Sequence, residues 1–384
     1  MRYWKSIMAL GLSASMLSQL AIPVYAQTNK PDGYDDQRWE QIIDNRLEYD
    51  EIEDRVVNFS SSYLSVEYET SKLYAPYEEA VNSLEGSIED SKSALKDAKE
   101  LGDQADIIEK NILLKTEQGT KKAYETVIKR YKGSTDRVLN TTVKGSLVMA
   151  SEGLMISYYR LVSALEMMDA NITMLQSTYD SVIVQQSLGM ATANDILMAQ
   201  DQLLTAKVQQ QTTKNQLDQV KHNLCLLLGW EYDADIEFGA IPEPDQNRIS
   251  QMNLESDIQK AIGNNYTLSD LRHSSASGVS AKQNRLKQME DMEAQITTGV
   301  NLSHSEVLKA QAAYDAASSA YESARLNHDA AGRQYQLGIL SPLQYQQMTV
   351  GYMVEKMNYD NAKLDFFQAM ENYDWAIKGN LSLE

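Results

Sequence analysis

Histidine, cysteine and acidic side chains are the residues in this sequence that could bind a metal or transfer a proton. The four histidines lie on separate segments, without the spacing of a metal site: His222, His273, His304 and His328. Adjacent acids such as Glu89 and Asp90 lie in a charged stretch with a helical pattern, where solvation explains them. The sequence has no glycine-rich phosphate loop, serine nucleophile elbow or Cys-x-x-Cys pair. We therefore predict no catalytic, metal or cofactor site, and we predict that the protein is not an enzyme.

The single cysteine, Cys225, cannot close a disulfide within the chain. It lies among leucines, in Leu224–Leu228, so we interpret it as a small apolar residue on a packed helix. The alternative is a reactive thiol. Without disulfides, the stability of this chain must come from the packing of its helices.

Tyrosine is unusually frequent, with 22 residues, and near the C-terminus several tyrosines recur seven or fourteen positions apart. These are Tyr314, Tyr321, Tyr335, Tyr345, Tyr352, Tyr359 and Tyr373. Seven residues make about two helical turns, so this spacing places the rings on one face of a helix. We interpret them as a packing seam between helices, and a ligand site is the less favoured alternative.

A duplicated segment positions these helices. The first copy contains Leu188-Gly189 and ends at Leu228-Gly229, and the second contains Leu337-Gly338 and ends at Lys378-Gly379. Each copy has a long helical pattern on either side of its first glycine. In the first copy, an apolar face is expected to follow the hinge: Leu197, Leu204, Val208, Leu217, Val220, Leu224 and Leu227. The duplication predicts two long helical hairpins in tandem.

The residues at each hinge predict how the hairpin turns. Gly189 and Gly338 accept the left-handed backbone that ends many helices. Thr192 and Ser341 are placed to cap the helices that follow, and Asp195 falls at the third helical position of the first copy. In the second copy Pro342 suits the first helical position. Both hinges therefore read as tight hairpin tips.

This pattern resembles the TolC family of outer-membrane efflux proteins. The family's second tip carries Tyr-x-x-Gly followed by Ser or Thr, and Tyr335-Gln-Leu-Gly338 with Ser341 is similar. The first tip is similar at Gly189, Thr192, Asp195, Ile196 and Leu197, and the return helix ends in Leu228-Gly229. The resemblance covers roughly residues 40–380.

The resemblance implies an all-α fold in which two tandem hairpin repeats form an elongated antiparallel bundle, one protomer of a hollow helical cylinder. It implies a homo-trimer that works with a periplasmic or membrane-fusion adaptor protein and an inner-membrane transporter. The docking tips would comprise Leu188, Gly189, Thr192, Asp195, Leu197, Tyr335, Leu337, Gly338 and Ser341.

Two features depart from the family. Its members insert two β-strands in each repeat, but here residues 296–303 and 135–149 offer at most short pieces, so little or no β-structure is expected. The family's second tip often carries two acids three residues apart, where this chain has Gln344 and Gln347. Asp195, Gln344 and Gln347 are the candidate channel-lining residues at the tips.

Residues 1–26 have the pattern of a secretion signal, with Arg2 and Lys5 before an apolar stretch and a cleavage site at Val24-Tyr25-Ala26. The chain carries a net charge of −19, and removing the signal makes it more acidic. Because phosphate contacts need clustered Lys and Arg, we predict no nucleic-acid partner. The expected location is the cell envelope: the outer membrane or periplasm by the resemblance, or the cell wall or outer face where there is no outer membrane.

Composition and breaks in the helical pattern suggest the organisation of the chain. Residues 133–145 and 297–301 look like helix breaks, and the opening Glu51–Asn58 has a partner in Asp257–Asn264. We expect a signal (1–26), a flexible leader (27–38), repeat 1 (39–229, with an extra charged segment at about 84–145), a connector (230–251) and repeat 2 (252–380).

The function expected from these features is a helical conduit in an efflux or secretion assembly, with tips that dock an adaptor. Two alternatives remain open. One is a structural coiled-coil protein of the cell surface or envelope that does not transport. The other is a regulator of a wall enzyme that binds through the charged residues 81–131.

Overall fold

The computed structural model describes residues 30–102 and 104–381, so the predicted signal and residues 27–29 of the leader lie outside it. The described chain is almost entirely helical, which confirms the all-α prediction. Its elements are α2 (Asp36–Ile43), β1 (Arg46–Leu47), η1 (Tyr49–Glu51), α3 (Ile52–Phe59), α4 (Ser61–Ser71), α5 (Ala75–Leu101), α6 (Gln104–Arg137), η2 (Val138–Val143), α7 (Lys144–Ser187), α8 (Ala193–Leu227), β2 (Glu237–Phe238), α9 (Asn247–Gln251), α10 (Leu254–Asn264), α11 (Tyr266–His273), α12 (Val279–Gln336) and α13 (Pro342–Ile377).

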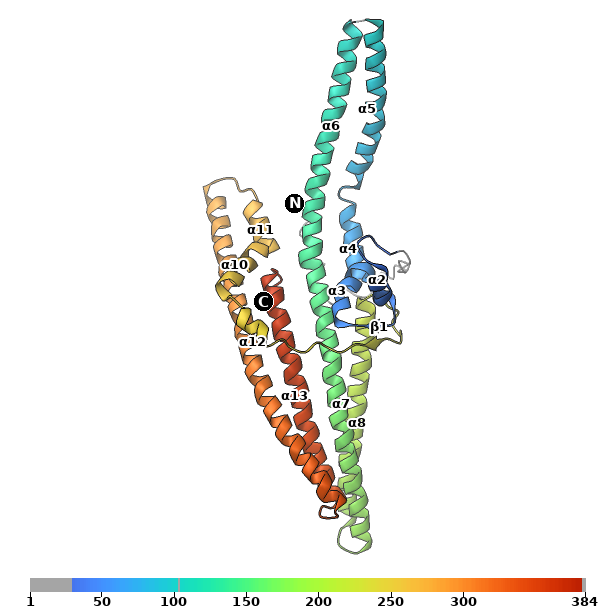
Figure 1. Ribbon diagram of the computed structural model, residues 1–384, viewed down its shortest axis with the longest axis vertical. Coiled ribbons are helices and arrows are strands. Elements are labelled where there is room, and N and C mark those ends of the chain that lie inside the picture. The colour runs from blue at the N-terminus through green and yellow to red at the C-terminus, as the bar shows by residue number, and fades with distance from the viewer. Residues whose placement is uncertain (1–29, 103, 382–384) are drawn as a thin grey trace. The chain divides into compact units, whose positions relative to one another are not determined.

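The chain divides into two compact units. One spans Val57–Gly145, and the other joins the segment that ends at Val56 to the chain from Ser146 onward. The first unit is built on the hairpin of α5 and α6, which run side by side from a turn at Gly102 (Figure 1). Ile88, Leu95 and Ala98 on α5 are buried against α6.

One sequence prediction for this first unit was wrong. The expected break at residues 133–145 is helical, because α6 continues to Arg137 and passes into a π-helical turn, η2. Leu101, the last residue of α5, lies at the hairpin turn with 83% of its surface exposed. Gly102 ends α5 there with a left-handed backbone (φ 77°).

The second unit contains the two hairpins predicted from the duplication, α7–α8 and α12–α13 (Figure 1). Phe366, Met370 and Tyr373 on α13 pack with Ile296 and Val300 on α12 in one buried core. Helices α10 and α11 cover this core. A smaller cluster joins α7 to α13.

The break expected at residues 297–301 is also absent, because α12 runs without interruption from Val279 to Gln336. The hydroxyls of Thr297 and Thr298 donate to the carbonyls of Glu293 and Ala294, four residues earlier. Both hydroxyls therefore have hydrogen-bond partners within the helix. Val300 is fully buried, and its packing favours the continuous helix.

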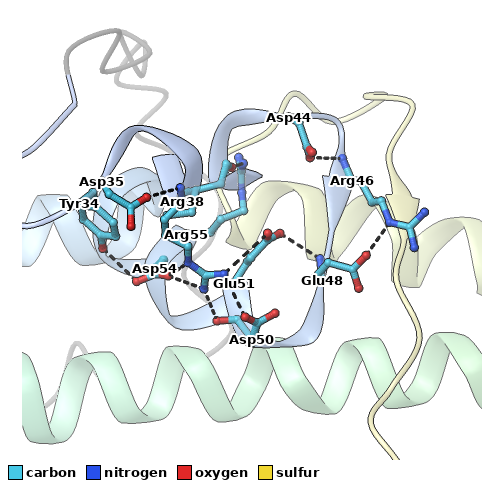
Figure 2. Close-up of polar contacts among 11 residues, drawn as sticks. Tyr34, Asp35, Arg38, Asp44, Arg46, Glu48, Asp50, Glu51, Asp54 and Arg55 are labelled. Carbon is cyan, nitrogen blue, oxygen red and sulfur yellow. Dashed lines mark hydrogen bonds and ion pairs between the residues drawn. The ribbon is translucent and has the colours of Figure 1, made fainter. Parts of the chain in front are cut away.

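The N-terminal segment is fixed by a polar cluster, shown in Figure 2. The Arg38 guanidinium donates to Asp50 at 2.9 Å and to Asp54 at 2.7 Å, and Tyr34 donates to Asp54 at 2.9 Å. Desolvation lowers the pKa of Arg38, but the hydrogen bonds and charges of Asp54 and Asp50 together outweigh it, so the pKa is raised. Arg38 is neutralised by these carboxylates, so the cluster holds α2 against α3.

Arg55 links α3 to the end of α8. Its buried guanidinium donates to the carbonyls of Ile42 and Leu228 and lies 3.2 Å from the ring centre of Trp230. Burial lowers the pKa of Arg55 to about 10. Nearby, β1 pairs in parallel with β2, in the register Arg46↔Glu237 and Leu47↔Phe238. The segment after Leu228-Gly229 is thus tied to the start of the chain.

Cys225 is 1% exposed on α8, and burial raises the pKa of its thiol. This confirms the interpretation of Cys225 as a packed apolar residue. Across the described part of the chain, no helix combines the length and apolar character needed to cross a membrane.

Candidate functional site: the hairpin tips

The first tip joins α7 to α8 through a closed set of backbone hydrogen bonds. The Gly189 amide donates to Gln186 at 3.0 Å, and the Met190 amide donates to Gln185 at 2.8 Å. The second bond spans five residues and requires a left-handed residue before it, which is Gly189 (φ 75°). Glycine is the residue that adopts this conformation without steric cost.

Thr192 then starts α8 as predicted. Its hydroxyl accepts from the Asp195 amide at 3.2 Å, and the Thr192 amide donates to the Asp195 carboxylate at 2.7 Å. The Thr192 hydroxyl also donates to this carboxylate at 2.8 Å. The bonds from Thr192 lower the pKa of Asp195. The two residues form a reciprocal capping box, which fixes the direction in which α8 leaves the tip.

The second tip repeats this geometry with different side chains. The Gly338 amide donates to Tyr335 at 2.9 Å, and the Ile339 amide donates to Gln334 at 2.9 Å. Ser341 caps α13, since its hydroxyl accepts from the Gln344 amide at 3.3 Å while its own amide donates to the Gln344 side chain at 2.9 Å. Pro342 follows the cap as predicted. The cap predictions are thus confirmed at both tips.

Both tips present large apolar side chains to solvent. Leu188 and Met190 flank Gly189 with 68% and 75% of their surfaces exposed, and Leu337 and Ile339 flank Gly338 with 76% and 66% exposed. The hydrogen bonds satisfy the backbone, so these side chains are what a partner would meet. Both turns point toward the same end of the unit (Figure 1).

A ladder of stacked or tilted aromatic rings lies between α12 and α13 behind the second tip. The rings alternate between α12 and α13 with centroids 4.8–5.8 Å apart: Tyr314, Tyr359, Tyr321, Tyr352, His328, Tyr345 and Tyr335. This confirms the packing seam for the predicted tyrosines except Tyr373, which lies in the buried core and donates to Asp257. His328 occupies a tyrosine position in the ladder, and its Nε2 lies 3.1 Å from the Thr349 hydroxyl. The last ring, Tyr335, lies only three residues before Gly338.

Polar contacts between α7 and α13 hold the two hairpins together. Arg160 donates to Asp365 at 2.5 Å, and Ser163 donates to Asp360 at 2.9 Å. Lys356 donates to Glu166 at 2.6 Å, nearer to the tips. These pairs, together with the buried Ile156 and Leu364, couple the two hairpins over several turns.

The predicted site residues differ in what their side chains do. Leu197 is 63% exposed, and Gln344 and Gln347 are also exposed. The Asp195 carboxylate is engaged in the cap of α8, although it remains at the surface. The channel-lining role of Asp195, Gln344 and Gln347 stays a prediction.

The apolar face expected on α8 is covered within this chain only toward the end of the helix, where Leu224 is fully buried. Leu204 and Val208 are 52% and 67% exposed, whereas Ala199 and Leu203 are buried. Sequence reasoning also missed Met190 and Ile339 as exposed tip residues. The signal was present, because each hinge glycine has an apolar residue on both sides.

No group of three or more His, Cys, Asp or Glu side chains that could hold a metal ion occurs within residues 30–102 and 104–381. His222 packs against Tyr232, His304 packs against Tyr373, and His273 bonds the Ser269 carbonyl. The four histidines are thus not brought together.

Comparison with known proteins gives structural similarities only. No family model matches this chain, and no curated protein matches it. Among solved structures, the CmeC outer membrane channel of Campylobacter jejuni is 11% identical, with a TM-score of 0.43, over 69% of this chain and 68% of that chain. The outer membrane protein VceC of Vibrio cholerae is 12% identical, with a TM-score of 0.45, over 70% of this chain and 76% of that one. CusC, whose structures are described in terms of transmembrane channel formation, is 13% identical, with a TM-score of 0.45, over 83% of this chain and 96% of that chain. In structure, this chain is similar to these outer membrane proteins.

Proposed function

We propose that this chain is an exported, TolC-like component of an efflux or secretion assembly in the cell envelope. Three copies would pack their hairpins side by side around a conduit, and the tips would dock a membrane-fusion adaptor that links them to an inner-membrane transporter. The role is passive, so no catalytic step is assigned to this chain. The observation that carries the proposal is the pair of matched tips.

The tips support docking because two different sequences build the same geometry. Thr192 with Asp195 and Ser341 with Gln344 give equivalent caps, and each leaves apolar side chains exposed around a glycine. Exposed leucine, methionine and isoleucine side chains gain free energy when a partner covers them. A tip needed only to reverse the chain direction would need no such side chains.

The outward face of α8 supports the packing of copies. Leu197, Leu204 and Val208 recur at helical spacing on α8, and all three are more than half exposed. A neighbouring helix that covered them would remove this apolar surface from water. The conduit proposal assigns the face to an adjacent protomer. If the protein were a structural spacer or a regulator of a wall enzyme, this apolar face of α8 would have no assigned role.

The proposal is tested by charging the tips without changing their backbone. In a strain that lacks the protein, the variant Met190→Asp with Ile339→Asp should fail to restore resistance to toxic compounds or protein export. The matched control is Leu286→Asp with Leu302→Asp, at leucines that are 50% and 62% exposed on α12 away from the tips. This control should restore the phenotype.

Two outcomes would contradict the proposal. One is full restoration by the tip variant. The other is a monomer by light scattering at micromolar concentration, which would favour a structural spacer. A photo-crosslinking residue at position 190 or 339 should also capture an adaptor, whereas the same residue at position 302 should not.

A further inference from the structure

The outward face of α6, the face opposite α5, carries a regular seam of exposed residues. They are spaced alternately four and three positions apart: Lys115, Gly119, Lys122, Thr126, Lys129 and Gly133. This alternation is the spacing with which one helix packs along another. Every second residue of the seam is a lysine. The residues between the lysines are small, so the backbone of a second helix can approach closely. Within its own hairpin, α6 uses the opposite face to contact α5.

The lysines of this seam are available for a partner. Within the described residues, Lys115, Lys122 and Lys129 form no ion pair. On the side of α6 that faces α5, by contrast, Lys121 pairs with Glu85 at 2.7 Å and Lys132 pairs with Glu78 at 2.6 Å. The seam itself contains no acidic residue, although the whole chain has a net charge of −19. An acidic partner therefore fits this face.

The outward face of α5 has the complementary character. Its exposed residues are again spaced alternately four and three positions apart, with three small residues among them: Glu79, Ser83, Gly86, Asp90, Ser93, Asp97 and Glu100. None of these positions is lysine or arginine, although the exposed Lys96 lies at the border of the face. Within the described chain, none of its four acids is engaged in an ion pair. The hairpin is thus a two-helix ribbon with a basic edge on α6 and an acidic edge on α5.

The charged residues of the two edges also lie at similar distances from the turn of the hairpin. Counted from the turn at Gly102, Lys115 and Asp90 both lie about three helical turns away. Lys129 lies about seven turns away and Glu79 about six, a difference that a lysine side chain can span. Two hairpins placed side by side in the same orientation would bring these charges together, with α6 of one antiparallel to α5 of the next.

We propose that the basic edge of α6 binds the acidic edge of α5 in a second copy of this chain. The seven-residue spacing and the small residues Gly119, Thr126 and Gly133 favour a helix over a lipid surface or a polyanion, which need no such periodicity. The acidic edge at matching height favours another copy over an unrelated helix. The contact is heterologous, because different faces of the two copies meet. It does not depend on the conduit proposed above.

Charge reversal tests this pairing in the purified full chain. The basic-edge variant is Lys115→Glu, Lys122→Glu and Lys129→Glu, and the acidic-edge variant is Glu79→Lys, Asp90→Lys and Asp97→Lys. Each variant alone should self-associate about tenfold or more weakly than wild type in light scattering or sedimentation. An equimolar mixture of the two should associate again, because a reversed edge of one then meets the opposite charge on the other.

The matched control carries the same charge change in the second unit: Lys207→Glu, Lys282→Glu and Lys287→Glu, at exposed lysines. It should associate as wild type does. Circular dichroism should show the same helicity for all variants. If both edge variants keep the wild-type mass, or if their mixture does not associate, the proposal is wrong. A trimer held through other helices would give this result even if the conduit proposal holds.

Binding to vesicles of phosphatidylcholine with phosphatidylglycerol tests the rival occupant. If the basic-edge variant loses vesicle binding while its self-association is unchanged, the lysines serve an anionic surface and the pairing is overturned. Self-association that weakens about tenfold in high salt, without vesicle binding, supports the pairing, since salt screens exposed charges.

Discussion

The indole Nε1 of Trp375 on α13 donates a hydrogen bond to the Glu152 carboxyl on α7, at 3.0 Å. Both side chains are buried, at 4% and 9% exposed. Burial raises the pKa of Glu152 to about 7, and the nearby negative charge of Glu371 adds to the rise, whereas the Trp375 bond and the charge of Lys378 oppose it. A single carboxyl at the junction of the two hairpins thus titrates near neutral pH.

This carboxyl should make the stability of the second unit depend on pH. The folded state holds the Glu152 proton more tightly than the unfolded state does, so its contribution is fully present below pH 4.5. It is lost as the pH rises through about 7. We expect the free energy of unfolding to fall by roughly 2–3 kcal/mol over this range. Urea unfolding at pH 5 and pH 8 measures it, and Glu152→Gln should remove the difference. An equal pH dependence in that variant would show that other groups cause it.

Glycine substitutions should separate the tips from the helix interiors. Gly189→Ala and Gly338→Ala place a Cβ on a left-handed backbone, and each should cost about 1 kcal/mol of unfolding free energy. Gly153→Ala and Gly351→Ala lie within α7 and α13 with open space around the added Cβ. These control variants should stabilise the protein by up to about 1 kcal/mol, because alanine is the better helix former. Thermal unfolding compares the four, and a tip variant as stable as a control would contradict the turn geometry.

The two tips should respond differently to acid. The pKa of Asp195 is lowered by its bonds with Thr192, so this cap is complete above the ordinary aspartate pKa of 3.8 and is lost as the pH falls through the lowered value. Gln344 fills the same position in the second tip and does not titrate. Hydrogen exchange at the start of α8 should therefore speed up in acid relative to the start of α13, after correction for the intrinsic rates. Asp195→Asn should abolish the difference between the tips.

The stacked rings of α12 and α13 should be energetically coupled. Tyr321 and Tyr359 stack with centroids 5.1 Å apart and planes 11° apart. A double-mutant cycle to alanine should give a coupling of about 0.5–1.5 kcal/mol. Tyr321 and Tyr345 are not ring neighbours in the ladder, and a cycle on this pair should be nearly additive. Equal coupling in both cycles would mean that the rings act only through general packing.

The tips could be predicted from the sequence because their geometry is local. A glycine that ends a helix and a Thr or Ser three residues later specify hydrogen bonds within a few residues of each other. Gly189 with Thr192 and Gly338 with Ser341 therefore behave as predicted. The ladder could also be predicted in part, since tyrosines seven residues apart share one helical face.

The errors arose where packing at a distance overrides local preference. Thr297, Thr298 and Gly299 suggest a break, but the buried Val300 and the side chain of Leu381, which lies against Gly299, favour a continuous helix. The exposure of Leu204 could not be foreseen for a different reason. The helical spacing of Leu204 predicts that another helix covers its side chain. The spacing does not show whether that helix belongs to the same chain or to another copy.

The aromatic ladder also limits how α12 can move against α13. Its rings recur every seven residues on both helices, so matching partners meet again only after a displacement of about 10 Å. Smaller axial sliding would unstack every ring at once. The ladder therefore opposes sliding of α12 along α13. A displacement imposed at Gly338 would move the two helices together.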